Sequence, residues 1–334
     1  MPEAIPKQTA SNIKTSKLQQ CLEAIWYNNA WGKQLLYPLE LIYKALARAD
    51  RYQKLKKTIQ HPIPVIVVGN ISVGGTGKTP LVVYLCELLK AAGYSSGIVT
   101  RGYGGKATAW PVLVRADSDP NEYGDEPVLM AQRSGVPVVA GPNRNDDIEY
   151  LLSQNIVDVI ISDDGLQHYS LARDIEIVVI DQLRGFGNQR CLPAGPLREP
   201  VSRLDSVDFV VSHEPMALAD YSMQLEAQLV CRLNFAIQQP LLSWKETKVH
   251  AVTGIGNPSR FFALLKAAGL DVTEHSFPDH YQFDTSDVLF GDDLPVIMTA
   301  KDAVKCRAFA ADHHWYVPVG AVLSERFDQD IIEK

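Results

Sequence analysis

The segment VVGNISVGGTGKTP, residues 67–80, begins at the end of an apolar run and then places three glycines close together, namely Gly74, Gly75 and Gly77. Such a turn lets the backbone curl with its N–H groups pointing inward, which makes an anion site at the N-terminus of a helix. The backbone of four consecutive residues would line this site, namely Gly74, Gly75, Thr76 and Gly77. Lys78 is then placed to reach the β- and γ-phosphates of a nucleoside triphosphate, and the Thr79 hydroxyl to bind Mg²⁺.

This segment departs at one position from the strict phosphate-loop pattern, which has glycine where this chain has Ser72. A glycine-rich turn without a phosphate is the alternative. A helix is expected to begin after Gly77 and to end at Gly93. We interpret the apolar run, the GTGKT motif and this helix together as a P-loop.

Two acids, Asp163 and Asp164, end the apolar segment VDVIISDD. An apolar strand that ends in an acid is how P-loop proteins hold Mg²⁺ and its waters. Both loops would emerge at the carboxyl ends of parallel strands, so the acids and the P-loop can share one crevice. A helix cap or an ordinary turn is the alternative for this acid pair.

Two further polar clusters could supply a proton acceptor. YGDEP puts Asp125 and Glu126 in a turn flanked by glycine and proline, and FPDHYQF offers Asp279 and His280. A kinase needs such a group to take the proton from an attacking hydroxyl. Because the same residue types are common in structural turns, they do not by themselves choose among these four.

From residue 60 on, short runs rich in Val and Ile alternate with helix-like stretches. Runs that are apolar throughout are typical of strands buried on both faces of a parallel sheet. The expected strands lie at residues 64–69, 97–100, 136–141, 157–164, 175–181 and 207–212. The gaps leave room for crossover helices, so we expect a doubly wound α/β domain.

A second, smaller α/β unit is expected to start near Lys248. Its strands and helix would lie at residues 249–254, 257–269, 272–277, 295–299 and 315–319. The length of 334 residues also suggests about two domains. We divide the chain into an N-terminal segment, a P-loop core, a polar linker, a C-terminal domain and a tail, at residues 1–60, 61–237, 238–247, 248–320 and 321–334.

A basic amphipathic helix is expected at residues 35–57, interrupted near Pro38. Its apolar residues share one face, namely Leu39, Ile42, Tyr43 and Leu46. Residues 48–57 hold five basic side chains and one acidic one, a local charge of +4. Such a helix can lie in a membrane interface or pack on the α/β core, and periodicity alone favours packing on the core.

The whole chain holds 32 basic and 39 acidic side chains, a net charge of −7. This argues against nucleic acid as a partner, because such binders need a dominant basic face. The five cysteines are far apart, so we expect no disulfide framework or zinc site, and a reducing compartment. No apolar run is long enough to span a membrane, the N-terminus lacks a signal-peptide core, and no obligate protein partner is evident.

Taken together, the motifs resemble those of the tetraacyldisaccharide 4′-kinase family of lipid A synthesis. They are GNISVGGTGKTP, TRGYGG, GDEP, GPNR, DDGLQH, RGFGNQRCLPAGPLREP, TGIGNPSRFF, FPDHY and TAKD, between about residues 64 and 302. The resemblance implies ATP-dependent phosphorylation of the 4′-hydroxyl of an acylated disaccharide 1-phosphate. It also implies a Rossmann-like P-loop core, a smaller C-terminal α/β domain on a two-stranded linker, and a peripheral protein on the cytoplasmic face of the bacterial inner membrane.

The resemblance further implies roles for individual residues. Asp125 would be the catalytic base, assisted by His280, and Lys78 would neutralise the transferred phosphoryl group. Mg²⁺ would be held by Thr79, Asp163 and Asp164. Support for this centre would come from Glu126, Gln167 and His168. Because Asp125 and His280 lie in different expected domains, domain closure would assemble the site.

Arginine forks suit phosphates, so several arginines are candidates for contact with ATP or with the acceptor's 1-phosphate. They are Arg144 in GPNR and Arg184, Arg190 and Arg198 in the loop at residues 184–200. The sequence does not assign either anion to any of them, and pairing with Glu199 or Asp205 is the alternative.

An acylated acceptor stays in the bilayer, so the resemblance turns the interpretation of residues 35–57 toward membrane docking. Two other functions stay open. One is a P-loop kinase or amide ligase acting on a soluble metabolite, and the other is a nucleotide-dependent switch or metal-insertion ATPase.

Overall fold

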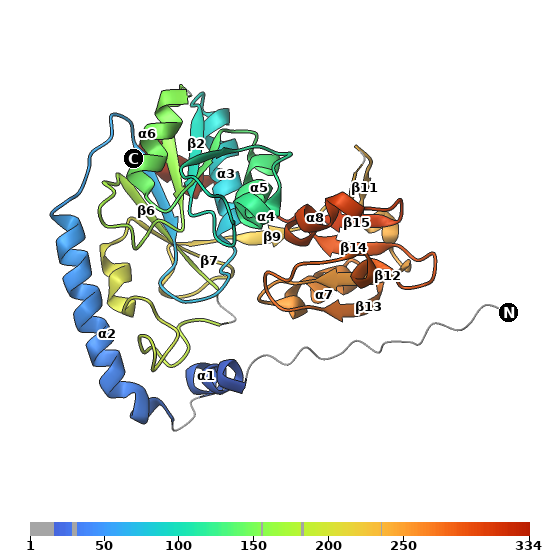
Figure 1. Ribbon diagram of the computed structural model, residues 1–334, viewed down its shortest axis with the longest axis horizontal. Helices are drawn as coiled ribbons and strands as arrows, with labels where there is room; N and C mark the ends of the chain where they lie inside the picture. The colour runs from blue at the N-terminus through green and yellow to red at the C-terminus, as the bar shows by residue number, and fades with distance from the viewer. Residues whose placement is uncertain (1–16, 29–31, 155, 182–183, 235) are drawn as a thin grey trace.

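The structure is a computed structural model that describes residues 17–28, 32–154, 156–181, 184–234 and 236–334. The first 16 residues, which were expected to carry no signal peptide, lie outside this part of the chain. Two sheets build two domains that lie side by side (Figure 1).

Within the described residues, eight strands form the first sheet in the order β3-β4-β2-β5-β1-β6-β7-β8. They are β1 (Val65–Gly69), β2 (Ser96–Thr100), β3 (Val112–Val114), β4 (Val138–Ala140), β5 (Val159–Asp163), β6 (Ile175–Ile180), β7 (Phe209–Ser212) and β8 (Tyr221–Ser222). All neighbouring pairs of these strands run parallel except β3 and β4. The expected α/β fold with a mainly parallel sheet is therefore confirmed.

Helices cover both faces of this sheet, as Figure 1 shows. They are α3 (Lys78–Ala91), α4 (Pro120–Tyr123), α5 (Asp125–Ser134) and α6 (Arg144–Gln154), with a 3₁₀ helix at Val201–Ser206. In β1, Ile66 and Val68 pack in one hydrophobic cluster, whereas Val65 and Val67 pack in another. This division explains why the strand is apolar at every position: both of its faces are buried.

The second sheet has six described strands in the order β11-β10-β15-β14-β12-β13. They are β10 (Leu229–Arg232), β11 (Gln238–Pro240), β12 (Lys248–Thr253), β13 (Asp271–Ser276), β14 (Val296–Thr299) and β15 (His314–Val317). Its helices are α7 (Pro258–Ala267) and α8 (Ala300–Cys306), with 3₁₀ helices at Leu241–Trp244, Thr285–Val288 and Arg307–Phe309. The smaller C-terminal α/β domain is therefore present, and it begins near Leu229 rather than near Lys248.

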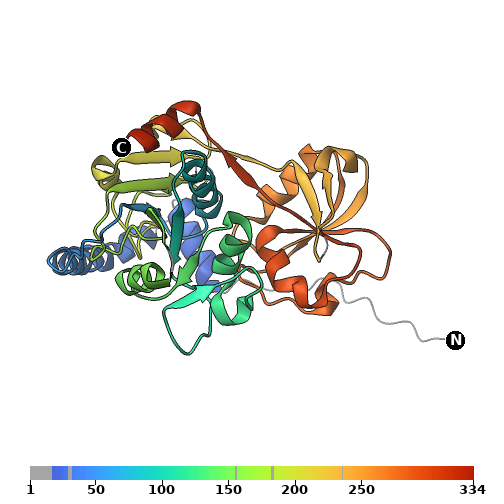
Figure 2. The same ribbon diagram turned by 90° about the horizontal axis from the view of Figure 1, so that it is seen from above.

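Two antiparallel strands, β9 (Gln224–Glu226) and β16 (Gly320–Val322), connect the domains. Figure 2 shows these two strands crossing together from one domain to the other. The linker expected at residues 238–247 was misplaced, because that stretch begins with the edge strand β11 and then packs Leu241 and Trp244 into the second core. The exposed side chains of an edge strand gave it the composition of a linker.

The stretch expected as a tail, residues 321–334, instead completes the first domain. It contains most of β16 and the helix α9 (Glu325–Glu333). Phe327 of this helix is fully buried. Its ring lies 5.2 Å from that of Tyr221 and 6.2 Å from that of Phe209, measured between centroids.

We expect Phe327→Ala to lower the free energy of unfolding by about 3–5 kcal/mol, because it removes a buried ring and leaves a cavity. Urea denaturation followed by circular dichroism measures this loss. Ile332→Ala on the same helix is the control, since that side chain is 36% exposed. A loss for Phe327→Ala no larger than that of the control would contradict the packing of α9.

The N-terminal helices are α1 (Lys17–Tyr27) and α2 (Gly32–Leu55). Contrary to expectation, α2 continues through Pro38. A proline there removes one main-chain hydrogen bond near the start of a 24-residue helix, which the remaining turns tolerate. None of the described helices is both long enough and apolar enough to cross a membrane.

The inner face of α2 is held by polar contacts. Glu40 is 1% exposed, and it pairs with Arg190 at 3.0 Å and with Lys44 at 2.5 Å. This pairing gives Arg190 a structural partner in place of the anion considered above. Tyr43 also faces inward, because its hydroxyl donates to the main-chain oxygen of Arg198 at 2.9 Å. Tyr43 therefore does not share the outer face expected for it.

Candidate functional site

The P-loop joins β1 to α3, and two of its glycines have backbone conformations that other residues rarely adopt. Gly74 has φ +107° and Gly77 has φ +69°. A Cβ atom on Gly77 would lie 2.7 Å from the ring of His213. Glycine is therefore required at the turn that starts α3, as the P-loop interpretation predicts.

Lys78, the first residue of α3, makes an ion pair with Asp164, the acid directly after β5. Its Nζ lies 3.1 Å from Oδ1 of Asp164, and Arg198 contacts the same carboxylate at 3.3 Å. Lys78 also donates to Oδ1 of Asn70 at 3.4 Å. Burial would raise the pKa of Asp164, but the two cations outweigh burial and hold the pKa well below its usual range. Asp164 is therefore ionised at neutral pH.

Asp163 ends β5 and is 3% exposed. Its Oδ2 accepts a hydrogen bond from the Thr100 hydroxyl at 3.0 Å, whereas Oδ1 is buried with no hydrogen-bond partner in the described part of the chain. Burial raises the pKa of Asp163 to about 6, and the charges of Asp164 and Glu126 act in the same direction. A buried carboxylate oxygen without a partner is costly, so this atom points to a cation or its bound water.

The loop at residues 184–200 folds against the P-loop and delivers Arg198 to the acid pair. The main-chain N–H of Arg198 donates to the oxygen of Ile71 at 2.7 Å. Nη1 of Arg198 then contacts Asp164 and donates to Oε1 of Gln167 at 3.3 Å. Two of the expected site residues, Arg198 and Gln167, are thus held beside the acid that pairs with Lys78.

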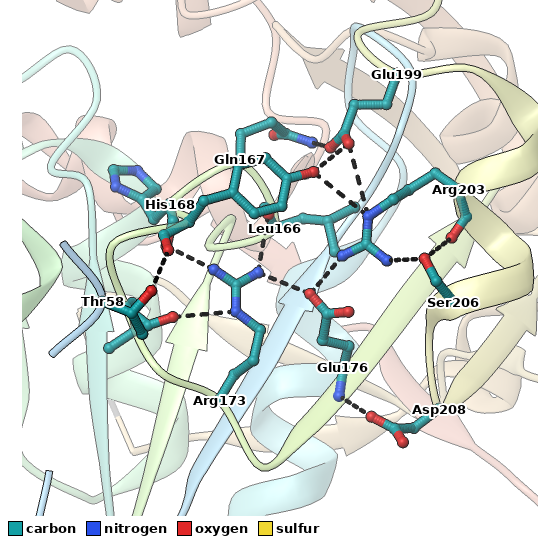
Figure 3. A network of polar contacts seen from close by, with 12 residues as sticks. Thr58, Leu166, Gln167, His168, Arg173, Glu176, Glu199, Arg203, Ser206 and Asp208 are labelled. Atoms are coloured by element: carbon teal, nitrogen blue, oxygen red, sulfur yellow. Dashed lines mark hydrogen bonds and ion pairs between the residues drawn. The ribbon is translucent and has the colours of Figure 1, made fainter. Parts of the chain in front are cut away.

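Arginines brace the chain directly after the acid pair (Figure 3). Arg173 donates to the main-chain oxygens of Leu166 and His168, at 3.0 and 2.5 Å. Arg173 and Arg203 both donate to the Glu176 carboxylate. The ring of His168 turns away from these arginines in Figure 3, and burial lowers its pKa to about 4. His168 is therefore uncharged at neutral pH.

Asp125 and His280 meet across the two domains. Asp125 begins α5, where the positive end of the helix favours a carboxylate. Nδ1 of His280, in the loop after β13, lies 3.2 Å from Oδ2 of Asp125. This hydrogen bond raises the pKa of His280. Burial would raise the pKa of Asp125, but His280 and the charge of Lys301 together lower it. The structure thus brings together the two residues that the motifs paired.

The arginines considered for anion binding take different positions. Arg144 is 1% exposed and donates to the main-chain oxygen of Asp163 at 3.1 Å. Its guanidinium is therefore occupied by buried contacts next to the acid pair, so the expected phosphate contact is not available to it. Arg184 lies over the P-loop, with Nη1 2.7 Å from the position that a Cβ on Gly74 would take. Its Nη2 donates to the main-chain oxygen of Gly256 in the second domain at 2.7 Å.

Sequence reasoning assigned no role to three residues that the structure places here, namely Asn70, Thr100 and Lys301. Asn70 follows β1, Thr100 ends β2, and Lys301 lies just after β14. The carboxyl ends of parallel strands are where ligands bind in open α/β sheets. Asp163 was predicted because it lies at the carboxyl end of a strand. The same criterion, applied to β1, β2 and β14, would have found Asn70, Thr100 and Lys301.

A P-loop, an acid pair at the end of a neighbouring strand and an Asp–His pair across two domains define a P-loop nucleotide-binding enzyme. A family model described as tetraacyldisaccharide-1-P 4′-kinase matches residues 32–334. The chain therefore belongs to the tetraacyldisaccharide 4′-kinase family.

Individual relatives agree with this assignment. The tetraacyldisaccharide 4′-kinase of Nitrosococcus oceani is 46% identical over 310 residues, with 92% of each chain covered. That of Alcanivorax borkumensis is 45% identical over 321 residues, covering 95% of this chain and 98% of the relative. The crystal structure of LpxK from Aquifex aeolicus in complex with ATP has a TM-score of 0.74 at 30% identity, covering 90% of this chain and 98% of that one.

Proposed function

We propose that this protein transfers the γ-phosphoryl group of ATP to the 4′-hydroxyl of tetraacyldisaccharide 1-phosphate, a lipid A precursor. Family membership over residues 32–334 supports the reaction. The observation that carries the proposal for the site is the 3.2 Å contact between Asp125 and His280. A kinase needs an acceptor for the proton of the attacking hydroxyl, and this pair can serve as one.

In the proposed reaction, the P-loop backbone binds the phosphates of ATP, and Lys78 neutralises charge on the transferred group. The 4′-oxygen attacks the γ-phosphorus, its O–H bond breaks, and the bond between the γ-phosphorus and ADP breaks as the new O–P bond forms. Asp125 accepts the proton, and His280 stabilises the protonated pair through its hydrogen bond. Positioning and charge neutralisation supply most of the rate acceleration.

Mg²⁺ fits the acid pair, and the residues that would hold it are Thr79, Asp163 and Asp164. When bound, Mg²⁺ neutralises phosphate oxygens of the nucleotide. The unpartnered Oδ1 of Asp163 is available for it. In such sites Mg²⁺ needs only one or two carboxylates plus phosphates. A cluster of three or more metal-binding side chains is accordingly not required, and the described residues contain none.

Arg184 and Arg198 are proposed to contact phosphates from two sides. Arg184 lies over Gly74 of the P-loop, which favours a phosphate of ATP. Arg198 contacts Asp164 at 3.3 Å, and the acceptor's 1-phosphate is its proposed partner. Gln167, Glu126 and His168 are proposed to support the centre without touching the reacting atoms.

The outer face of α2 supports docking on a membrane. Four apolar side chains at helical spacing are between 50% and 68% exposed, namely Leu35, Leu39, Ile42 and Leu46. An apolar row beside a basic helix end suits the surface of an anionic bilayer. We therefore propose that the protein is peripheral on the cytoplasmic face of the inner membrane, where an acylated acceptor would be found.

The double variant Leu39→Glu/Leu46→Glu is expected to lose most of its binding to vesicles that contain anionic lipid, because charged groups resist entry into the interface. Co-sedimentation with vesicles of phosphatidylethanolamine and phosphatidylglycerol measures this. Leu218→Glu/Leu242→Glu is the matched control, since these leucines are similarly exposed elsewhere, at 54% and 78%. Unchanged sedimentation of the α2 variant would refute docking through this face.

ATP turnover with and without the acylated disaccharide tests the proposed function. We expect ADP release to depend on the acceptor, and mass spectrometry to detect a product heavier by one phosphoryl group. Strong turnover without acceptor would favour the switch or ATPase instead. Phosphorylation of a soluble metabolite in place of the lipid would favour the alternative of a P-loop kinase that acts on soluble metabolites.

A further inference from the structure

We infer that Lys301 is a positioning residue that joins the two halves of the proton acceptor and opposes protonation of His280, so that the Nδ1–H of the neutral ring is directed at Asp125. The inference rests on the proposed function, which supplies the reaction in which the pair takes part. Among the residues that the structure describes, the contacts of Lys301 are with the Asp125–His280 pair and its neighbouring acids, and not with the P-loop or with Asp163 and Asp164.

The position of Lys301 is not explained by the stability of its own helix. Lys301 lies in the first turn of α8, where the positive end of a helix disfavours a cation. Its side chain is only 16% exposed. A buried ammonium group is costly unless anions pair with it, so its partners determine what it does.

Those partners come from both domains. Nζ of Lys301 lies within 4.0 Å of three carboxylates, those of Glu126 (2.9 Å), Asp279 (3.6 Å) and Asp125 (4.0 Å). Asp125 and Glu126 begin α5 in the first domain, whereas Asp279 precedes His280 in the second. One cation therefore holds together acids that would otherwise repel one another across the domain boundary.

The contacts of the His280 ring determine which nitrogen carries the proton. Nε2 lies 3.5 Å from Nζ of Lys301, and Nδ1 lies 3.2 Å from Oδ2 of Asp125. A lysine ammonium is only a donor, so Nε2 faces it as an acceptor. The proton of neutral His280 then lies on Nδ1 and is donated to Asp125.

The charge of Lys301 also opposes a second proton on His280. The groups that face the Asp125–His280 pair carry charges of both signs. The acids are Glu126 and Asp279, the bases are Lys301 and Lys305, and the ring of Tyr103 packs against His280. The bond to Asp125 raises the pKa of His280, and Lys301 lowers it. Removing the charge of Lys301 therefore moves the pKa of His280 upward, and that of Asp125 as well.

The first test is the titration of His280 in the full-length protein, followed by NMR of its ring C–H and assigned with His280→Gln. For Lys301→Met we expect the pKa of His280 to rise by about one unit. Lys301→Arg is expected to restore it. This measurement needs no turnover, so its outcome is independent of the proposed function. An unchanged pKa in Lys301→Met would overturn the inference.

The second test is the pH profile of kcat/KM with ATP and the acylated disaccharide. For Lys301→Met, the fall of kcat/KM on the acidic side of the profile is expected to move to higher pH by about one unit. At neutral pH we expect kcat to fall about tenfold or more, while KM for ATP changes little. Lys266→Met, an exposed lysine of the same domain, is the control. An equal loss at every pH would mean a merely structural role. Lys301→Gln is measured in parallel in case methionine prevents folding.

Discussion

Lys78→Ala is expected to lower kcat for phosphoryl transfer by about 10²–10³-fold or more. A preorganised cation or donor aimed at charge that develops in the transition state contributes this much when it is removed singly. Lys78 is well placed for this, because it starts α3 beside the P-loop backbone and its side chain is only 13% exposed. The fold should survive, since Asp164 keeps its contact with Arg198 at 3.3 Å.

Initial rates of lipid phosphorylation measure the effect of Lys78→Ala, and calorimetry with an ATP analogue measures binding separately. Lys90→Ala, at the exposed end of the same helix, is the matched control and should behave like the unmodified protein. A rate for Lys78→Ala within about threefold of that control would show that the P-loop lysine does not act on the transferred group.

Asp125→Asn is expected to lower kcat by about 10²–10⁴-fold, the usual contribution of a general base, while KM for ATP changes little. The amide keeps the shape of the carboxylate but cannot accept the proton. The pKa of Asp125 is held below its usual range, so the unmodified protein has this base ionised throughout the neutral range.

The pH dependence separates this role from a structural one. The pKa of His280 is raised by Asp125, so activity of the unmodified protein should fall as the pH drops through that raised value. In Asp125→Asn the cause of the rise is lost, and the residual activity should fall only at lower pH. Asp117→Asn, an exposed acid of the same domain, serves as the control. Near-normal kcat in Asp125→Asn would refute its role as the base.

Sequence reasoning predicted best where local pattern and burial agree. The strands β1 and β6 are apolar at nearly every position because both faces are covered, and that signal needs no knowledge of distant residues. The P-loop is equally local, since Gly77 and Lys78 stand next to each other in the chain. The acid pair was found by the same reasoning, applied at the end of a strand.

Prediction failed where a contact between distant residues decides the role of a side chain. Arg144 carries the expected residue type, yet its burial beneath Asp163 is set by packing that spacing does not reveal. Tyr43 fits the apolar face of α2, but a hydrogen bond to a residue more than a hundred positions away turns it inward. The edge strand β11 exposes its side chains, so its composition is that of a loop.

The strands β9 and β16 have a consequence for how often the Asp–His pair can form. If one strand alone joined the domains, rotation about its backbone bonds would let one domain turn freely relative to the other. The two hydrogen-bonded strands resist such twisting and bend mainly about one axis. Such a tether makes the meeting of Asp125 and His280 an intramolecular event with a high effective concentration, whatever the concentration of protein. We therefore expect that, if the domains separate to exchange substrate and product, this ribbon returns them to the same alignment.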